Sequence, residues 1–126
     1  MRRRRERGSA SVEFALVLPI VLVLTLAVVQ VGLVVRDDIV LVSAARAGAR
    51  EAAVTDDDER VRSAVDSAAA ALDVDRIDVT ISRAGRGGPA DVKLTYPERL
   101  RVPFVAWLFP SAITLHAAST MRQEFG

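Results

Sequence analysis

The chain has 126 residues, 51% of them hydrophobic, and its length corresponds to one small domain. It contains no cysteine, which excludes disulfides, thiolate metal sites and cysteine catalysis. Residues 1–8 hold five arginines and one glutamate, whereas the rest of the chain carries 12 basic and 15 acidic side chains. The body therefore has no basic excess, and we expect it not to bind nucleic acid.

The segment from Phe14 to Val35 contains 22 residues without a formal charge. As a helix it would extend about 33 Å, enough to cross a hydrocarbon core of about 30 Å. Four residues interrupt the apolar run, and transmembrane helices tolerate such residues: Pro19, Thr25, Gln30 and Gly32. A buried helix of a soluble protein is the alternative, but roughly 90 further residues are too few to surround it.

The flanks of this segment predict its orientation. Five arginines precede it, whereas Arg36 is followed at once by Asp37 and Asp38. The positive-inside rule then predicts a single pass of the cytoplasmic membrane, with the N-terminus cytoplasmic and residues 36–126 extracytoplasmic. A cleaved secretory signal is disfavoured because the apolar stretch is too long and no A-x-A pattern follows it.

The junction "RGSASVEFALVLP" places Glu13 just inside the apolar run, five residues after Gly8. A carboxylate at mid-span costs roughly 2.5–3.5 kcal/mol, and less near the interface. Glu13 either lies among the headgroups and is solvated, or it pairs with a cation. The order of glycine, small residues, glutamate and apolar helix resembles the class III signal of type IV pilin-like proteins. That resemblance implies that a prepilin peptidase cuts between Gly8 and Ser9.

Beyond the span, residues 36–75 have high helix propensity, and we expect the helix to continue into them. The small residues Ala44, Ala45 and Gly48 are candidates for close helix packing. Alternatively, the alanines are present only because they favour helix. Thr55 or Asp56 can cap a second helix, whose apolar stripe is expected to pack on a sheet: Val61, Val65, Ala68 and Leu72. The acidic run 56–59 lacks the spacing of a calcium loop, so a solvated cap is favoured.

Residues 76–126 alternate between apolar and polar side chains in three runs, around 77–81, 92–96 and 113–121. They predict a small antiparallel sheet whose first two strands form a hairpin across "AGRGGP". The loop 97–110 is punctuated by prolines and is unusually apolar. It either folds back over the core, binds a partner or dips into the membrane interface, and Phe104, Trp107 and Phe109 are candidate partner contacts.

Catalysis has little support in the sequence. His116 is the only histidine, and a pair with Ser119 or Ser111 would lack a G-x-S-x-G elbow and an acidic partner. We also find no metal-ligand spacing and no phosphate-binding glycine loop. We therefore expect a non-enzymatic protein without catalytic residues, cofactor or metal.

The predicted fold is α+β: a long N-terminal membrane-spanning helix, an outer helical segment and a three-stranded antiparallel sheet packed on helix, as in pilins. The expected organisation is a cytoplasmic basic leader (1–8), a transmembrane helix (9–35), a helical segment (36–75) and a β domain (76–126). Three pieces in this order resemble the TadE-like family of the tight-adherence (Tad/Flp) pilus system: "GSASVEFALVLP", "SAARAGAREAA" and "ITLHAASTMRQE".

The resemblance implies a minor pilin or pseudopilin that is anchored in the cytoplasmic membrane and is needed for pilus assembly or adhesion. Its implied partners are the prepilin peptidase, the Tad secretion and assembly platform, and other pilin-like subunits that contact its N-terminal helix. By the same resemblance, Glu13 pairs with the new α-amino group of a neighbouring subunit. Phe14 stands where major Flp pilins commonly have tyrosine, which favours a minor component. The alternative is a single-pass anchor that acts as an assembly or chaperone partner without entering the pilus.

Overall fold

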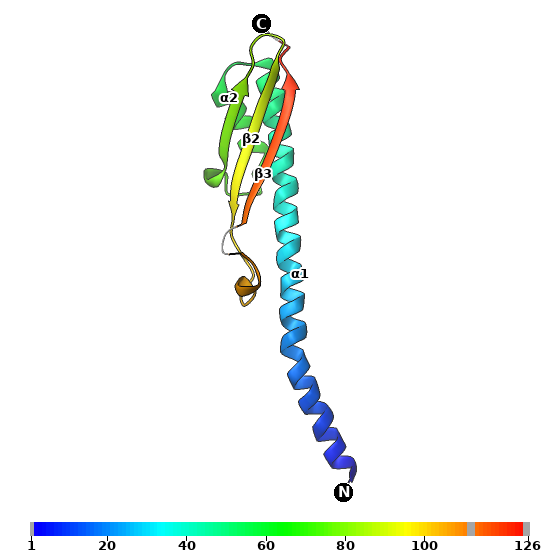
Figure 1. Cartoon of the computed structure of the whole chain (residues 1–126). Helices are drawn as coiled ribbons and strands as arrows, with labels where there is room; N and C mark the ends of the chain where they lie inside the picture. The colour runs from blue at the N-terminus through cyan, green and yellow to red at the C-terminus, as the bar shows by residue number, and fades with distance from the viewer. Residues whose placement is uncertain (1, 111–112, 125–126) are drawn as a thin grey trace. The chain divides into compact units, whose positions relative to one another are not determined.

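The computed structural model describes residues 2–110 and 113–124, with side chains from Gly8 onward. Two helices precede three strands: α1 (Arg2–Val54), α2 (Asp58–Ala68), β1 (Asp78–Arg83), β2 (Pro89–Glu98) and β3 (Ile113–Arg122) (Figure 1). Short 3₁₀ turns cover Val74–Arg76 and Ala106–Leu108. The α+β fold is the one predicted, and α1 continues without interruption through the apolar run and the small-residue segment.

The chain divides into two compact units. The first combines Met1–Gly32 with Leu100–Ser111, and the second combines Leu33–Arg99 with Ala112–Gly126. The apolar part of α1 therefore belongs with the proline-punctuated loop, whereas the outer part of α1 belongs with α2 and the sheet.

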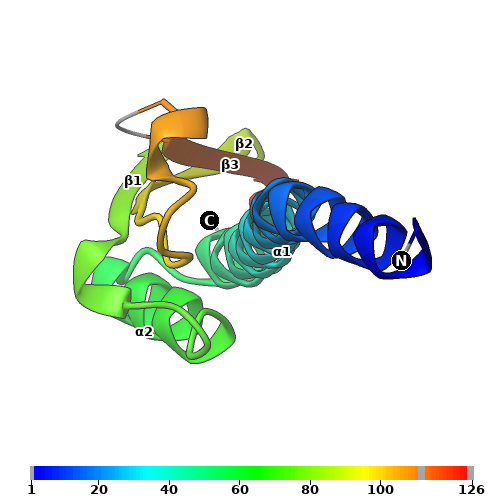
Figure 2. The ribbon, with the colours of Figure 1, turned by 90° about the horizontal axis from the view of Figure 1, so that it is seen from below.

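The sheet of the second unit has the order β1-β2-β3, with both pairs antiparallel. Leu94 in the central strand faces Val79 on one side and Ala117 on the other. The predicted hairpin turn is present, and its Gly85 and Gly87 have φ angles of 92° and 72°, which side chains disfavour. Figure 2 shows α2 and the outer part of α1 on one face of the sheet.

The core fills the space between this sheet and the two helices. Val61 and Val65 of the predicted stripe are fully buried, Ala68 is partly buried, and Leu72 joins the core just beyond the end of α2. They pack with alternate residues of the strands and with alanines of α1: Val79, Ala90, Val92, Leu94, Tyr96, Ala44, Ala45, Ala49 and Ala52. Each fully buried Val or Leu contributes roughly 1.5–3 kcal/mol.

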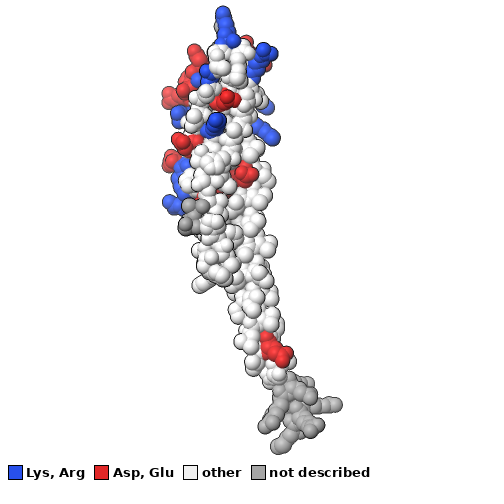
Figure 3. Space-filling model, in the orientation of Figure 1, with Lys and Arg blue, Asp and Glu red and all other residues white. Residues whose placement is uncertain are grey.

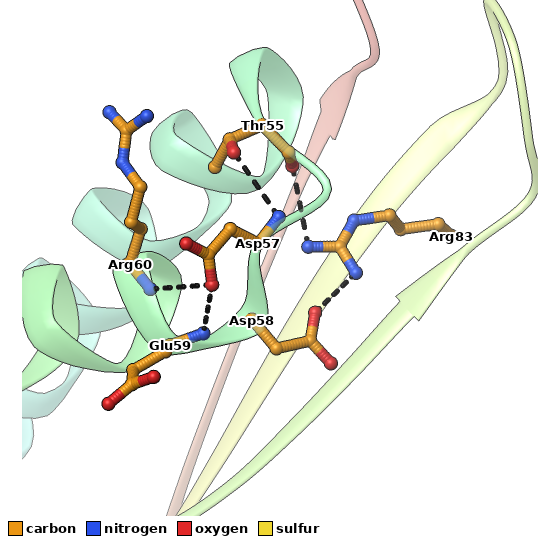
Figure 4. Close-up of polar contacts among 6 residues, drawn as sticks. All are labelled: Thr55, Asp57, Asp58, Glu59, Arg60 and Arg83. Carbon is orange, nitrogen blue, oxygen red and sulfur yellow. Dashed lines mark hydrogen bonds and ion pairs between the residues drawn. The ribbon is translucent and has the colours of Figure 1, made fainter.

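The start of α2 differs from the predicted cap by one or two residues. Asp57, not Thr55 or Asp56, is the N-cap, and its Oδ1 accepts hydrogen bonds from the backbone N–H of Glu59 and Arg60 (Figure 4). Thr55 Oγ1 accepts instead from the backbone N–H of Asp57, at 3.2 Å. The Thr55 hydroxyl thus positions Asp57, the residue that caps the helix. Thr55, Asp56 and Asp57 can all form such local hydrogen bonds, so sequence propensity alone does not decide which of them is the cap.

Arg83 of β1 connects the start of α2 to the sheet. The Arg83 guanidinium pairs with the Asp58 carboxylate and also donates to the carbonyl oxygen of Thr55 (Figure 4). At the opposite end of the sheet, Arg76 donates to the carbonyl oxygen of Pro97 at 2.7 Å and lies 5.5 Å from the ring centroid of Tyr96. The acidic residues Asp57 and Asp58 therefore act in capping and ion pairing.

Candidate functional site along the apolar helix

The predicted processing junction lies on a regular, exposed part of α1. Gly8, Ser9 and Glu13 are all helical and solvent-exposed. Ser9 and Glu13 are four residues apart, so they share one face, and Ser9 Oγ donates a hydrogen bond to Glu13 Oε1 at 3.3 Å. A Cβ added at Gly8 would meet no atom within 4 Å. The structure therefore places the serine and the glutamate side by side and leaves both accessible.

The apolar run of α1 presents its side chains outward. Phe14 is 67% exposed and Val28 is 73% exposed, and most residues between them are exposed as well. The helix is long and apolar enough to cross a membrane, and none of its most apolar 18-residue window is buried. Figure 3 shows a long stretch without charged side chains along this helix, in contrast to the many charged groups over the sheet and α2. A buried core helix of a soluble protein would show the opposite burial.

The small residues farther along α1 lie against elements of their own chain. Ala44 and Ala45 are fully buried in the core. A Cβ at Gly48 would come within 2.6 Å of Val65 Cγ2 and 3.1 Å of Val92 Cγ1. These residues let α1 approach α2 and β2 closely. Helix propensity alone does not explain a glycine at this position, because glycine disfavours helix.

Gln30 joins the apolar helix to the proline-punctuated loop. Its side chain is fully buried although it interrupts an apolar run. Gln30 Oε1 accepts hydrogen bonds from the backbone N–H groups of Arg101 and Val102, at 3.0 and 2.9 Å. The side chain thus satisfies two loop donors that a leucine at this position could not.

The loop then covers a part of the helix nearer the N-terminus. Trp107 and Leu108 line an apolar groove of about 350 Å³ together with four helix residues: Pro19, Ile20, Val23 and Leu24. Val105 is fully buried, whereas Phe104 and Trp107 are 79% and 74% exposed. Phe109 is half-buried. Two of the three candidate contact residues, Phe104 and Trp107, therefore present their rings outward.

His116 lies on the exposed face of β3, where its Nδ1 is 3.4 Å from the Oγ1 of Thr95 on the paired strand. Ser119 is three residues away on the same strand, so its side chain points to the opposite face of the sheet. The two side chains therefore do not form a pair. Ser111 lies outside the described residues.

Gln30 is the residue of this region whose contacts the sequence pattern does not predict. By composition Gln30 is one of several tolerated interruptions of the apolar segment, because composition does not show which polar residue has a partner. The signal in the sequence is a glutamine within a membrane-length apolar run, which is costly unless its amide group is hydrogen-bonded. The partner is 71 residues away in the chain, and only the tertiary structure identifies it.

Comparison with known proteins finds a family match in the N-terminal part of the chain. Residues 8–50 match the family model for TadE-like protein. This range contains the Gly8–Glu13 junction, the apolar helix and the small-residue segment, whereas the third resembling piece, around β3, lies outside it. No curated protein and no solved structure matches the chain. The chain thus carries a TadE-like domain in residues 8–50, which indicates a protein associated with Tad pili.

Proposed function

We propose that this protein is a minor pilin or pseudopilin of a Tad-type pilus, anchored in the cytoplasmic membrane by α1 and processed by a prepilin peptidase between Gly8 and Ser9. The observation that carries the proposal is the TadE-like match, which begins at Gly8 and covers an apolar helix whose side chains face outward. In this proposal residues 1–8 are a cytoplasmic leader and the sheet domain is extracytoplasmic.

The proposed role of Glu13 follows from the chemistry of the cut. Cleavage after Gly8 converts the amide nitrogen of Ser9 into a primary amine, which is largely protonated at neutral pH. A carboxylate held in an apolar surface is stabilised by such a cation. Glu13 of one subunit is thus suited to bind the Ser9 amine of its neighbour, and the Ser9 hydroxyl already orients the carboxylate.

A processing assay tests the first part of the proposal. Gly8→Ala should abolish cleavage by the prepilin peptidase, while Gly32→Ala in the same helix should be cut normally. Neither substitution meets an atom within 4 Å, so a misfolded helix would not explain a difference. Mass spectrometry of the product should give a mature N-terminus at Ser9 in the wild type and in Gly32→Ala. An intact leader on the exported wild-type protein would favour the single-pass anchor that stays outside the pilus.

Pilus incorporation tests the second part. Glu13→Gln keeps the shape of the side chain and can still accept from Ser9, but it removes the charge. We expect normal membrane insertion and processing, with strongly reduced recovery of the protein in sheared pili. Glu59→Gln, an exposed charge removal on α2, is the matched control and should be incorporated like the wild type. Equal recovery of both variants would contradict the proposed role of Glu13.

A further inference from the structure

We propose that the loop 100–110 is embedded in lipid, so that its aromatic tip occupies the hydrocarbon region of the bilayer beside α1. The inference rests on the proposed membrane anchoring of α1 and adds a second membrane contact. The acyl chains of the surrounding lipids cover the exposed apolar surface of the loop and fill its groove with α1.

The first argument is depth. Trp107 and Leu108 share their groove with helix residues between Pro19 and Leu24. At 1.5 Å per residue, Leu24 lies about 16 Å and Pro19 about 24 Å from the outer end of the apolar run at Val35. A bilayer core is about 30 Å thick, so a helix that spans it carries this groove to its middle.

The second argument is exposure. Phe104 and Trp107 present most of their surface outward, and the groove between loop and helix is lined by apolar residues. In water these rings would form an unfavourable apolar patch continuous with the exposed helix. Acyl chains remove that penalty for the loop and the helix together, because both surfaces are uncharged at this level (Figure 3).

The third argument is that four of the loop's backbone N–H groups are already hydrogen-bonded, which lowers the cost of placing an irregular segment in lipid. Gln30 accepts from Arg101 and Val102, and Leu108 and Phe109 donate to the carbonyls of Val105 and Ala106. Pro103 and Pro110 have no N–H group to satisfy.

The remaining polar features of the loop suit the same location. The indole Nε1 of Trp107 donates to the carbonyl oxygen of Phe104 at 2.8 Å, so the ring can enter lipid without an unpaired donor. Arg101 stands beside Gln30, about 8 Å below the outer end of the run, from where a long cationic side chain can reach the headgroups.

Trp107 is the only tryptophan in the chain, which makes its fluorescence a direct probe. The full chain is reconstituted in phosphatidylethanolamine–phosphatidylglycerol vesicles, with and without lipids brominated at the middle of the acyl chain. We expect blue-shifted emission that is quenched by the brominated lipid and protected from acrylamide. Two variants that also carry Trp107→Phe give reference values: Leu22→Trp, at an exposed position in the middle of the apolar helix, for lipid, and Arg86→Trp in the exposed hairpin turn for water.

Each alternative result overturns the proposal in a distinguishable way. Acrylamide quenching equal to that of the Arg86→Trp reference would place the loop in water while the Leu22→Trp reference still reports an inserted helix. Protection from both quenchers would indicate a protein occupant, such as a second copy. Absence of lipid quenching in the Leu22→Trp reference would contradict the membrane anchoring itself.

A second comparison tests how the loop is held. Gln30→Leu removes the acceptor for two loop N–H groups, so Trp107 should lose quenching by mid-chain bromine and gain acrylamide quenching. Thr25→Val is the matched control, because Thr25 Oγ1 donates only within α1, to the carbonyl oxygen of Val21. Unchanged quenching in Gln30→Leu would overturn the role of Gln30 in holding the loop.

Discussion

A methyl group at Gly48 would collide with the core, and this makes the residue a sensitive test of the helix packing. The added Cβ would lie 2.6 Å from Val65 Cγ2, and that β-branched side chain is fully buried. Overpacking costs about 1–3 kcal/mol, against about 1 kcal/mol gained from helix propensity. We expect Gly48→Ala to lower the free energy of unfolding by about 1 kcal/mol, within the range of core overpacking.

Urea denaturation of the full chain in detergent micelles, followed by circular dichroism, measures this effect. Gly32→Ala is the control in the same helix and should not destabilise the protein, because its Cβ meets nothing within 4 Å. In a double-mutant cycle, Val65→Ala should remove most of the cost of Gly48→Ala. Additive costs in that cycle would contradict the close contact.

The cap of α2 provides a second test at the residue scale. Asp57→Ala removes the acceptor for two backbone N–H groups and should cost about 1 kcal/mol, as N-cap deletions do. Asp56→Ala, at the neighbouring exposed position that the sequence also offered as a cap, should change stability by less than about 0.5 kcal/mol. The same urea titration compares them, and equal losses would show that Asp57 is not the dominant cap.

At the scale of elements, an ion pair between Arg83 and Asp58 connects β1 to the start of α2. The Arg83 side chain is 19% exposed, whereas the paired Asp58 is 55% exposed, so solvent screens much of the attraction. Asp58→Asn should therefore cost less than about 1 kcal/mol. The loss should shrink in about 1 M salt, where the Debye length falls to about 3 Å.

Asp66→Asn is the control for this pair, because Asp66 is an exposed acidic residue of the same helix. The difference in unfolding free energy between the Asp66→Asn variant and the wild type should change little with salt. A cost for Asp58→Asn that persists undiminished at high salt would contradict a screened ion pair and indicate a role in packing.

At the scale of the whole molecule, the charge asymmetry predicts membrane topology. The absence of cysteine allows single-cysteine labelling in an otherwise unreactive chain. In cells without prepilin peptidase, a membrane-impermeant maleimide should label Arg86→Cys in intact spheroplasts. It should label Arg3→Cys only after permeabilisation. The reverse pattern would overturn the predicted orientation.

The elements of this fold could be read from local patterns because each pattern has its own period. The uncharged, mainly apolar run predicted a membrane-length helix, and the alternation around Val79, Val92 and Leu94 predicted strands of one antiparallel sheet. The glycine-rich segment between them predicted the hairpin turn. Boundaries were less certain, as the cap of α2 shows, because Thr55, Asp56 and Asp57 all suit a cap and their hydrogen bonds decide among them.

The sequence by itself therefore determined the α+β class, the exposed apolar helix and the resemblance at Gly8 and Glu13, since these depend on residue order and local spacing. Only the tertiary structure decided what Gln30 and Gly48 do. Gln30 meets loop donors 71 and 72 residues away, and Gly48 meets side chains of α2 and β2. Such contacts depend on how distant segments pack, and no local pattern encodes which polar or small residue will find a partner.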